Sequence, residues 1–215
     1  FRRPLSGLCA AAVAAALMAA LAGCDMRPGS ATPAAFHSTD ITGAPYAQGF
    51  SLKDPAGQTR TLQDFRGQVV VVFFGFTQCP DICPTALAEI QAVKEALGPQ
   101  GAKVRPVFIS LDPERDTPEV LKTYVAQFGS DVVALRPSLE ELPALAKSFK
   151  IFYRKVEGKT PGSYTLDHTA GSYVFDAEGR IRVRLRGLAS RAIGAEKLRA
   201  ALSAGDVVID VPAFA

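Results

Sequence analysis

Residues 69–84 read Val-Val-Val-Val-Phe-Phe-Gly-Phe-Thr-Gln-Cys-Pro-Asp-Ile-Cys-Pro. The first six of these residues are apolar, a pattern typical of a central strand that is buried on both faces. Cys79 and Cys83 follow the strand, and apolar residues with helical spacing continue from Thr85 to Leu97. The two thiols are therefore predicted at a strand-to-helix junction, where they can form a disulfide or hold a soft metal ion.

Strand and helix patterns alternate on both sides of this junction. A turn signal at residues 54–57 predicts a β-hairpin before it. After it, residues 116–119 supply a capping residue, a proline for the first turn and an acid, which together predict a helix start. The predicted hairpins cover 50–52 with 59–62 and 169–176 with 181–185, the other strands 68–75, 104–111, 132–135 and 151–156, and the helices 85–97, 116–128, 139–149 and 195–202. This order predicts an α/β, thioredoxin-like fold with an extra N-terminal β-hairpin and an insertion before the last β-hairpin.

The composition is that of one globular domain. The chain has 215 residues, of which 48% are hydrophobic and 21% charged. Its net charge is +3, and it contains no long block of lysine and arginine. These features argue against nucleic acid as a partner.

The first 23 residues have the pattern of a bacterial lipoprotein signal peptide. Two arginines precede an apolar run over residues 8–22, and small residues lead into Cys24. We expect Cys24 to be lipidated, which would anchor the protein to the periplasmic face of the bacterial inner membrane. An uncleaved membrane helix is the alternative, although the apolar run is short for a full span.

The remainder divides into three predicted parts. Residues 24–45 are rich in Pro, Gly, Ser, Thr and Ala and predict a flexible tether. Residues 46–205 are predicted to form the folded domain, and residues 206–215 a C-terminal tail. Because Cys9 leaves with the signal peptide and Cys24 carries lipid, Cys79 and Cys83 would be the only remaining thiols, in a compartment that oxidises such pairs.

The spacing of Cys79 and Cys83 favours a metal over thiol exchange. Thioredoxin-type oxidoreductases have two residues between their cysteines, whereas this chain has three, and one of them, Asp81, favours a cation. A third ligand should be histidine. The chain has two: His37 lies in the predicted tether, and His168 lies just before the last hairpin, in a loop that faces the cysteines in thioredoxin-like folds. Two thiolates and an imidazole suit copper, with zinc as the alternative.

Three segments resemble the Sco/SenC family of membrane-anchored, thioredoxin-like copper chaperones for cytochrome c oxidase assembly. They are Phe76–Pro84, Ser110–Pro118 and Asp167–Thr169, and the resemblance covers roughly residues 45 to 205. It implies that Cys79, Cys83 and His168 bind Cu(I) or Cu(II). It also implies delivery of copper to the dinuclear site of oxidase subunit II, or reduction of that site's thiols. The lipoprotein-like N-terminus departs from the transmembrane helix of many members.

Three aspartates, Asp81, Asp112 and Asp167, are candidates for the rim of the site or for supporting its ligands. Asp112 to Pro118 follow the strand next to the cysteine strand. The segment is either a turn with a helix cap, or Asp112 or Arg115 belongs to the rim, where it contacts a partner or orients the site. Asp167 is a candidate to orient His168 through a hydrogen bond. A thiol–disulfide oxidoreductase acting on extracytoplasmic partners without a metal role is the main alternative function. A copper or redox sensor would share the same site, whereas a peroxiredoxin lacks its threonine and proline signature here.

Overall fold

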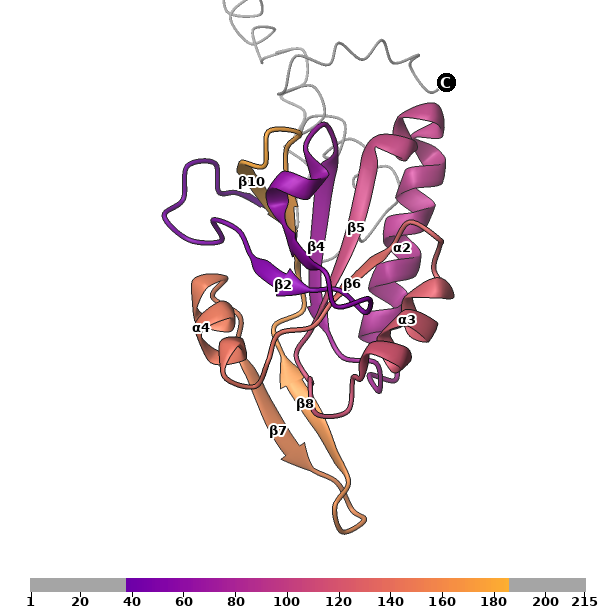
Figure 1. The fold of residues 1–215 in the computed structure, drawn as a ribbon, viewed down its shortest axis with the longest axis vertical. Helices are drawn as coiled ribbons and strands as arrows, with labels where there is room; N and C mark the ends of the chain where they lie inside the picture. Colours follow the sequence, from indigo (N-terminus) through magenta and orange to yellow (C-terminus); the bar gives the residue numbers. More distant parts are fainter. Residues whose placement is uncertain (1–37, 186–215) are drawn as a thin grey trace, which may run out of the picture. The chain divides into compact units, whose positions relative to one another are not determined.

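The computed structural model describes residues 38–185. A six-stranded sheet, in the order β1-β10-β9-β4-β5-β6, forms its centre (Figure 1), and two pairs of strands, β2 with β3 and β7 with β8, form separate small sheets. The strands are β1 Ser38–Asp40, β2 Ser51–Lys53, β3 Thr59–Thr61, β4 Val69–Gly75, β5 Val104–Ser110, β6 Val133–Leu135, β7 Tyr153–Glu157, β8 Tyr164–His168, β9 Ser172–Phe175 and β10 Ile181–Leu185.

β4 is the strand on which the fold is built. Every one of its seven residues is buried, as the unbroken apolar run predicted. It pairs in parallel with β5 on one side and antiparallel with β9 on the other. β-branched and aromatic side chains suit such a strand because both of its faces pack against other layers.

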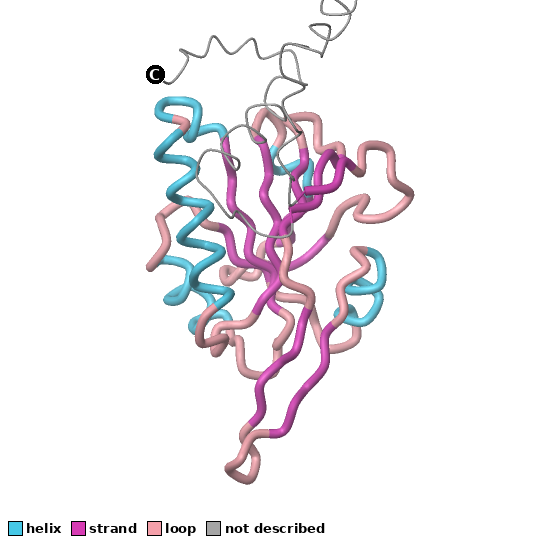
Figure 2. Tube along the Cα trace, turned by 180° about the vertical axis from the view of Figure 1, so that it is seen from behind, coloured by secondary structure: helices cyan, strands magenta, loops and turns pink. Residues whose placement is uncertain are grey.

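Helices cover both faces of this sheet. α2 Ile82–Ala96 and α3 Pro118–Ala126 lie on one side, and α4 Glu141–Ser148 lies on the other (Figures 1 and 2). Two short 3-10 helices complete the described part: η1 Leu62–Phe65 links β3 to β4, and η2 Gly98–Lys103 links α2 to β5. Between residues 38 and 185, no helix combines the length and the apolar character that a membrane span requires. This three-layer arrangement is the predicted thioredoxin-like α/β class.

Residues at the first turns of α2 and α3 explain where these two helices begin. Thr117 caps α3 by accepting a hydrogen bond from the amide of Val120 at 3.3 Å, and Pro118 occupies the first turn. α2 begins at Ile82, so that Cys83 belongs to its first turn. Pro84 is tolerated there because a first-turn residue needs no intrahelical amide bond.

The predicted insertion is a β-hairpin of its own. β7 and β8 pair antiparallel, with Tyr153 opposite His168 and Glu157 opposite Tyr164. We call these two strands the β7–β8 arm; it extends away from the six-stranded sheet (Figure 1). The sequence predicted β7 but not β8, and His168 is therefore the last residue of a strand rather than part of a loop.

The prediction of a tether over residues 24–45 is wrong at its C-terminal end. β1 pairs antiparallel with β10, with Ser38 opposite Leu185. Ile41 is buried, and its amide donates to the carbonyl of Arg182 at 2.9 Å. The predicted signal peptide, Cys24, His37, the helix over 195–202 and the tail over 206–215 lie outside the described residues.

Candidate metal centre

Three side chains from two parts of the fold meet at one end of β4. Cys79 lies in the loop after β4, Cys83 in the first turn of α2, and His168 at the end of β8. One ligand atom from each lies within 4.8 Å of the other two, and Sγ of Cys83 is 3.5 Å from Nε2 of His168. The expected convergence of the distant imidazole on the two thiols is therefore observed.

The Cys83 thiol is built into the core. Its residue is fully buried and packs beside the end of β4 at Gly75. A Cβ atom on Gly75 would lie 2.8 Å from that sulfur and 2.9 Å from the ring of Phe108. Glycine at this position thus makes room for the sulfur, a role that the sequence did not reveal.

The two thiols have different surroundings. Cys79 is half-buried, and its sulfur accepts a hydrogen bond from the backbone amide of Cys83 at 3.4 Å, at the N-terminus of α2. For Cys83, burial raises the pKa of the thiol, and its hydrogen bond with Cys79 raises it further. A helix N-terminus ordinarily lowers the pKa of a thiol, but at Cys83 the effect of desolvation is larger, and the pKa rises.

His168 is held in the tautomer that a metal needs. Its Nδ1 lies 3.1 Å from the carbonyl oxygen of Thr169. Because a carbonyl can only accept, Nδ1 carries the proton and Nε2 presents its lone pair toward Cys83. Burial lowers the pKa of the imidazole, which favours this neutral form. The edge of the ring also meets Phe76, with the ring centroids 5.8 Å apart.

The predicted role of Asp167 in orienting His168 is not what the structure shows. Its carboxylate pairs with Arg154 at 2.7 Å, and both side chains are more than half exposed. The orienting acceptor is instead the carbonyl of Thr169, which leaves no signal in a sequence because every residue has one.

A pocket of about 490 Å³ opens over two of the three candidate ligands. Cys79 and His168 line it, together with Asp81, Ile82 and Phe152; Phe76, Pro80, Thr165, Leu166, Asp167 and Thr169 complete the lining. The side chains of Ile82 and Phe152 are 52% and 57% exposed. Asp81 therefore lines the pocket beside the half-buried Cys79, and the exposed Ile82 and Phe152 form an apolar border around it.

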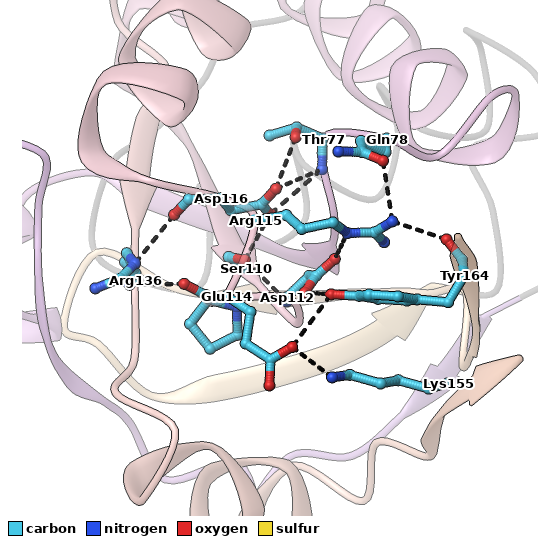
Figure 3. A network of polar contacts seen from close by, with 11 residues as sticks. Thr77, Gln78, Ser110, Asp112, Glu114, Arg115, Asp116, Arg136, Lys155 and Tyr164 are labelled. Carbon is cyan, nitrogen blue, oxygen red and sulfur yellow. Dashed lines mark hydrogen bonds and ion pairs between the residues drawn. The ribbon is translucent and has the colours of Figure 1, made fainter. Parts of the chain in front are cut away.

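Asp112 lies beneath the site rather than on its rim. It is buried, accepts a hydrogen bond from the hydroxyl of Tyr164 at 2.8 Å, and forms an ion pair with Arg115 (Figure 3). Its position excludes direct contact with a partner. Of the two interpretations of this segment, a turn before the α3 cap describes its backbone, and its carboxylate anchors the neighbouring side chains.

A second buried carboxylate, Asp116, fixes the cysteine loop. It accepts from the hydroxyl of Thr77 and the hydroxyl of Ser110, each at 2.6 Å, and from the amide of Thr77 at 3.2 Å (Figure 3). Burial raises its pKa, although these hydrogen bonds oppose the shift. Sequence reasoning treated Asp116 only as part of a helix start, because its contact with Thr77 spans 39 positions.

Comparison with known proteins agrees with the family resemblance seen in the sequence. The SCO1/SenC family model matches residues 38–203. The chain is 37% identical to a SCO2-like protein of Rickettsia felis over 132 residues, which is 61% of this chain and 64% of that relative. The match thus spans less than two thirds of that relative's length.

Solved structures share the fold, and one of the two described next was determined with copper bound. ScoI of Bradyrhizobium japonicum, whose structure was determined with copper bound, is similar with a TM-score of 0.65 and 37% identity, covering 75% of this chain and 99% of that one. Apo Sco1 of Thermus thermophilus is similar with a TM-score of 0.68 and 36% identity, covering 78% and 97%. The chain belongs to the SCO1/SenC family.

Proposed function

We propose that the protein is a copper chaperone that binds Cu(I) or Cu(II) through Cys79, Cys83 and His168. The observation that carries this proposal is that Nε2 of His168 faces Sγ of Cys83 at 3.5 Å while Nδ1 lies against the carbonyl oxygen of Thr169. Thiol–disulfide exchange needs no imidazole lone pair, whereas an imidazole nitrogen beside two thiolates completes a donor set that suits copper. Similarity to copper-bound ScoI supports the choice of copper.

The cargo is released by ligand exchange. Two thiolates and one imidazole leave Cu(I) open to an incoming ligand, so that an acceptor thiol can bind before a donor thiol leaves. Cys79 is the ligand that a partner reaches first, because it is half-buried and lines the pocket while Cys83 is fully buried. The acceptor that the family implies is the dinuclear copper site of cytochrome c oxidase subunit II.

The location of the protein forms part of the same proposal. Lipidation of Cys24 would hold the domain near a membrane-bound oxidase, with residues from 24 to the start of β1 as the tether. Metabolic labelling with a radioactive fatty acid tests this step. We expect label on the wild-type chain and none on Cys24→Ser.

The decisive experiment is a titration of the reduced protein with Cu(I) in competition with a chromophoric chelator. We expect one ion to bind and His168→Ala to weaken binding by more than about tenfold, since even groups that merely orient a ligand contribute about 10–100-fold. His37→Ala is the matched control and should bind as the wild type does. Equal affinity of His168→Ala and wild type would refute the three-ligand site.

The same variants separate the chaperone from a thiol–disulfide oxidoreductase. Reduction of a disulfide-containing acceptor peptide would require Cys79 and Cys83 but not His168. A protein in which His168→Ala keeps full reductase activity and loses only copper would have both capacities. One that binds no copper and still reduces the peptide would be an oxidoreductase alone.

A further inference from the structure

Arg115 connects the two segments that carry the candidate ligands. Its Nη1 donates to Oε1 of Gln78 at 2.9 Å and to the backbone carbonyl oxygen of Tyr164 at 2.7 Å (Figure 3). Gln78 is the chain neighbour of Cys79, and Tyr164 is the first residue of β8, whose last residue is His168. One nitrogen atom thus joins the cysteine loop to the β7–β8 arm.

Two further contacts hold the guanidinium group of Arg115 in place. Its Nε pairs with the buried carboxylate of Asp112. Its plane lies over the ring of Tyr164, with Cζ 3.6 Å from the ring centroid, and the hydroxyl of that ring donates to Asp112. Arg115, Asp112 and Tyr164 therefore form a closed set of contacts, in which no member can move alone.

The contacts of Arg115 continue toward His168 on the side of the cysteine loop. Cζ of Arg115 lies 5.9 Å from the centroid of the Phe76 ring, and that ring meets the His168 ring at 85°. The arm is attached to the same region by an ion pair between Lys155 and Glu114, but both side chains are nearly half exposed. An exposed pair contributes little, so the partly buried Arg115 is the stronger attachment.

Arg115 also retains an unpaired donor. Its Nη2 is buried and has no hydrogen-bond partner among the described residues. Buried donors without a partner are rare and cost free energy. The other donors of the guanidinium bond Asp112, Gln78 and Tyr164, and these bonds offset the cost of the unpaired Nη2.

We infer that Arg115 is a positioning residue that sets the distance between the imidazole of His168 and the two thiols by joining the cysteine loop to the β7–β8 arm. The inference rests on the proposed function, because its purpose is to hold two parts of one metal site in register. Within residues 38–185, Arg115 does not line the pocket over the site, and its side chain donates to Asp112, Gln78 and Tyr164 alone. It acts through its neighbours and does not bind the metal.

The test compares Arg115→Met with Arg136→Met. Arg136 is a matched control, because it donates to the backbone of the same segment, at Asp116 and Pro113, but reaches neither the cysteine loop nor the arm. The first readout needs no metal: nuclear Overhauser cross-peaks between the rings of His168 and Phe76 in the reduced, copper-free protein. We expect Arg115→Met to lose them and Arg136→Met to keep them.

The second readout is Cu(I) affinity, measured beside stability in denaturant. We expect Arg115→Met to bind about 10–100-fold more weakly than wild type, and Arg136→Met to bind as wild type does even if it is less stable. Arg115→Lys should bind Cu(I) as weakly as Arg115→Met does. An ammonium group cannot replace the planar guanidinium, which reaches Asp112, Gln78 and the carbonyl of Tyr164 at the same time. Unchanged cross-peaks and affinity in folded Arg115→Met would overturn the inference.

Two outcomes need a further variant or a separate interpretation. If Arg115→Met does not fold, Gln78→Ala decides, because Gln78 is exposed and its loss removes only the bond to the cysteine loop. We then expect weakened ring cross-peaks and a severalfold loss of affinity, and unchanged values for both would overturn the inference.

If the wild type binds no copper, the proposed function fails, but the cross-peaks of the copper-free proteins still decide whether Arg115 positions His168.

Discussion

The sulfur of Cys83 lies 2.8 Å from the point that a Cβ atom on Gly75 would occupy. The end of β4 and the first turn of α2 can therefore pack closely only because residue 75 has no side chain. The contact explains how a thiol can be a ligand and a core residue at once.

Gly75→Ala should therefore displace this sulfur or the ring of Phe108. We expect the free energy of unfolding to fall by about 1–3 kcal/mol, the usual cost of overpacking, with weaker binding of Cu(I). Denaturant titration measures the first effect and chelator competition the second. The control is a double-mutant cycle with Cys83→Ala: removal of the sulfur should relieve part of the strain, whereas additive losses would show that the contact is unimportant.

Loss of the Thr77 hydroxyl should loosen the cysteine loop. Thr77→Val preserves shape but removes the 2.6 Å hydrogen bond to the buried carboxylate of Asp116. We expect the free energy of unfolding to fall by about 1–3 kcal/mol, measured by urea titration. Thr85→Val is the matched control, since the Thr85 hydroxyl is exposed and only 3.5 Å from Asp81; it should change stability by less than about 0.5 kcal/mol. Equal effects of the two substitutions would contradict this account of the loop.

Stability of the copper-free, reduced protein should depend on pH through His168. Burial lowers the pKa of its imidazole below the ordinary value of 6.5. Below pH 6.5 the unfolded chain takes up this proton before the folded one does, so the contribution is present above pH 6.5 and is lost as pH falls toward the lowered pKa. A tenfold difference in proton affinity between the folded and unfolded chain corresponds to about 1.4 kcal/mol of stability.

Denaturant titrations between pH 7.5 and pH 5 provide the measurement. His168→Asn should flatten the decline at the acidic end, whereas His37→Asn should leave it as in wild type. A decline that is just as steep in His168→Asn would mean that another group is responsible.

The apolar border of the pocket should matter for transfer and not for folding. Ile82 and Phe152 are 52% and 57% exposed and line the pocket over the site. Under the proposed function a copper acceptor must cover this pocket, so Ile82→Ser and Phe152→Ser should slow transfer to the soluble copper domain of an oxidase subunit II. Stability should change by less than about 0.5 kcal/mol.

Leu139→Ser is the control for this effect, because Leu139 is equally exposed, at 58%, and lies away from the pocket. Stopped-flow absorbance would follow the transfer. Equal slowing by all three substitutions, or by none, would show that the acceptor does not dock on this border.

Local chemistry explains which elements could be predicted from the sequence. β4 is recognisable because a strand buried on both faces is apolar throughout, and the start of α3 is recognisable because its cap needs only neighbouring residues. β1 was missed because its three residues, Ser38–Asp40, are polar and form a strand only by pairing with β10. β8 was missed for a similar reason, since its partner β7 lies across a polar turn.

The candidate site divides in the same way. Cys79, Cys83 and His168 could be selected because their chemistry is specific and the fold class brings their segments together. The orienting carbonyl of Thr169 and the space provided by Gly75 could not, because neither depends on a distinctive side chain. Asp167 was an attractive orienting partner by adjacency, but a strand directs neighbouring side chains to opposite faces, and Asp167 faces Arg154 instead.

The sulfur donors follow β4 of the six-stranded sheet, whereas the nitrogen donor lies in the separate two-stranded sheet of β7 and β8. Cys83 is part of the core behind β4, whereas His168 ends a hairpin in which, among its ten strand residues, only Leu166 is fully buried. Substitutions along that hairpin can retune how firmly the cargo is held while leaving folding intact. Over evolutionary time, homologues that differ in retention of their ion should therefore differ first in residues 153–168, and the strand behind the sulfurs should stay constrained by packing.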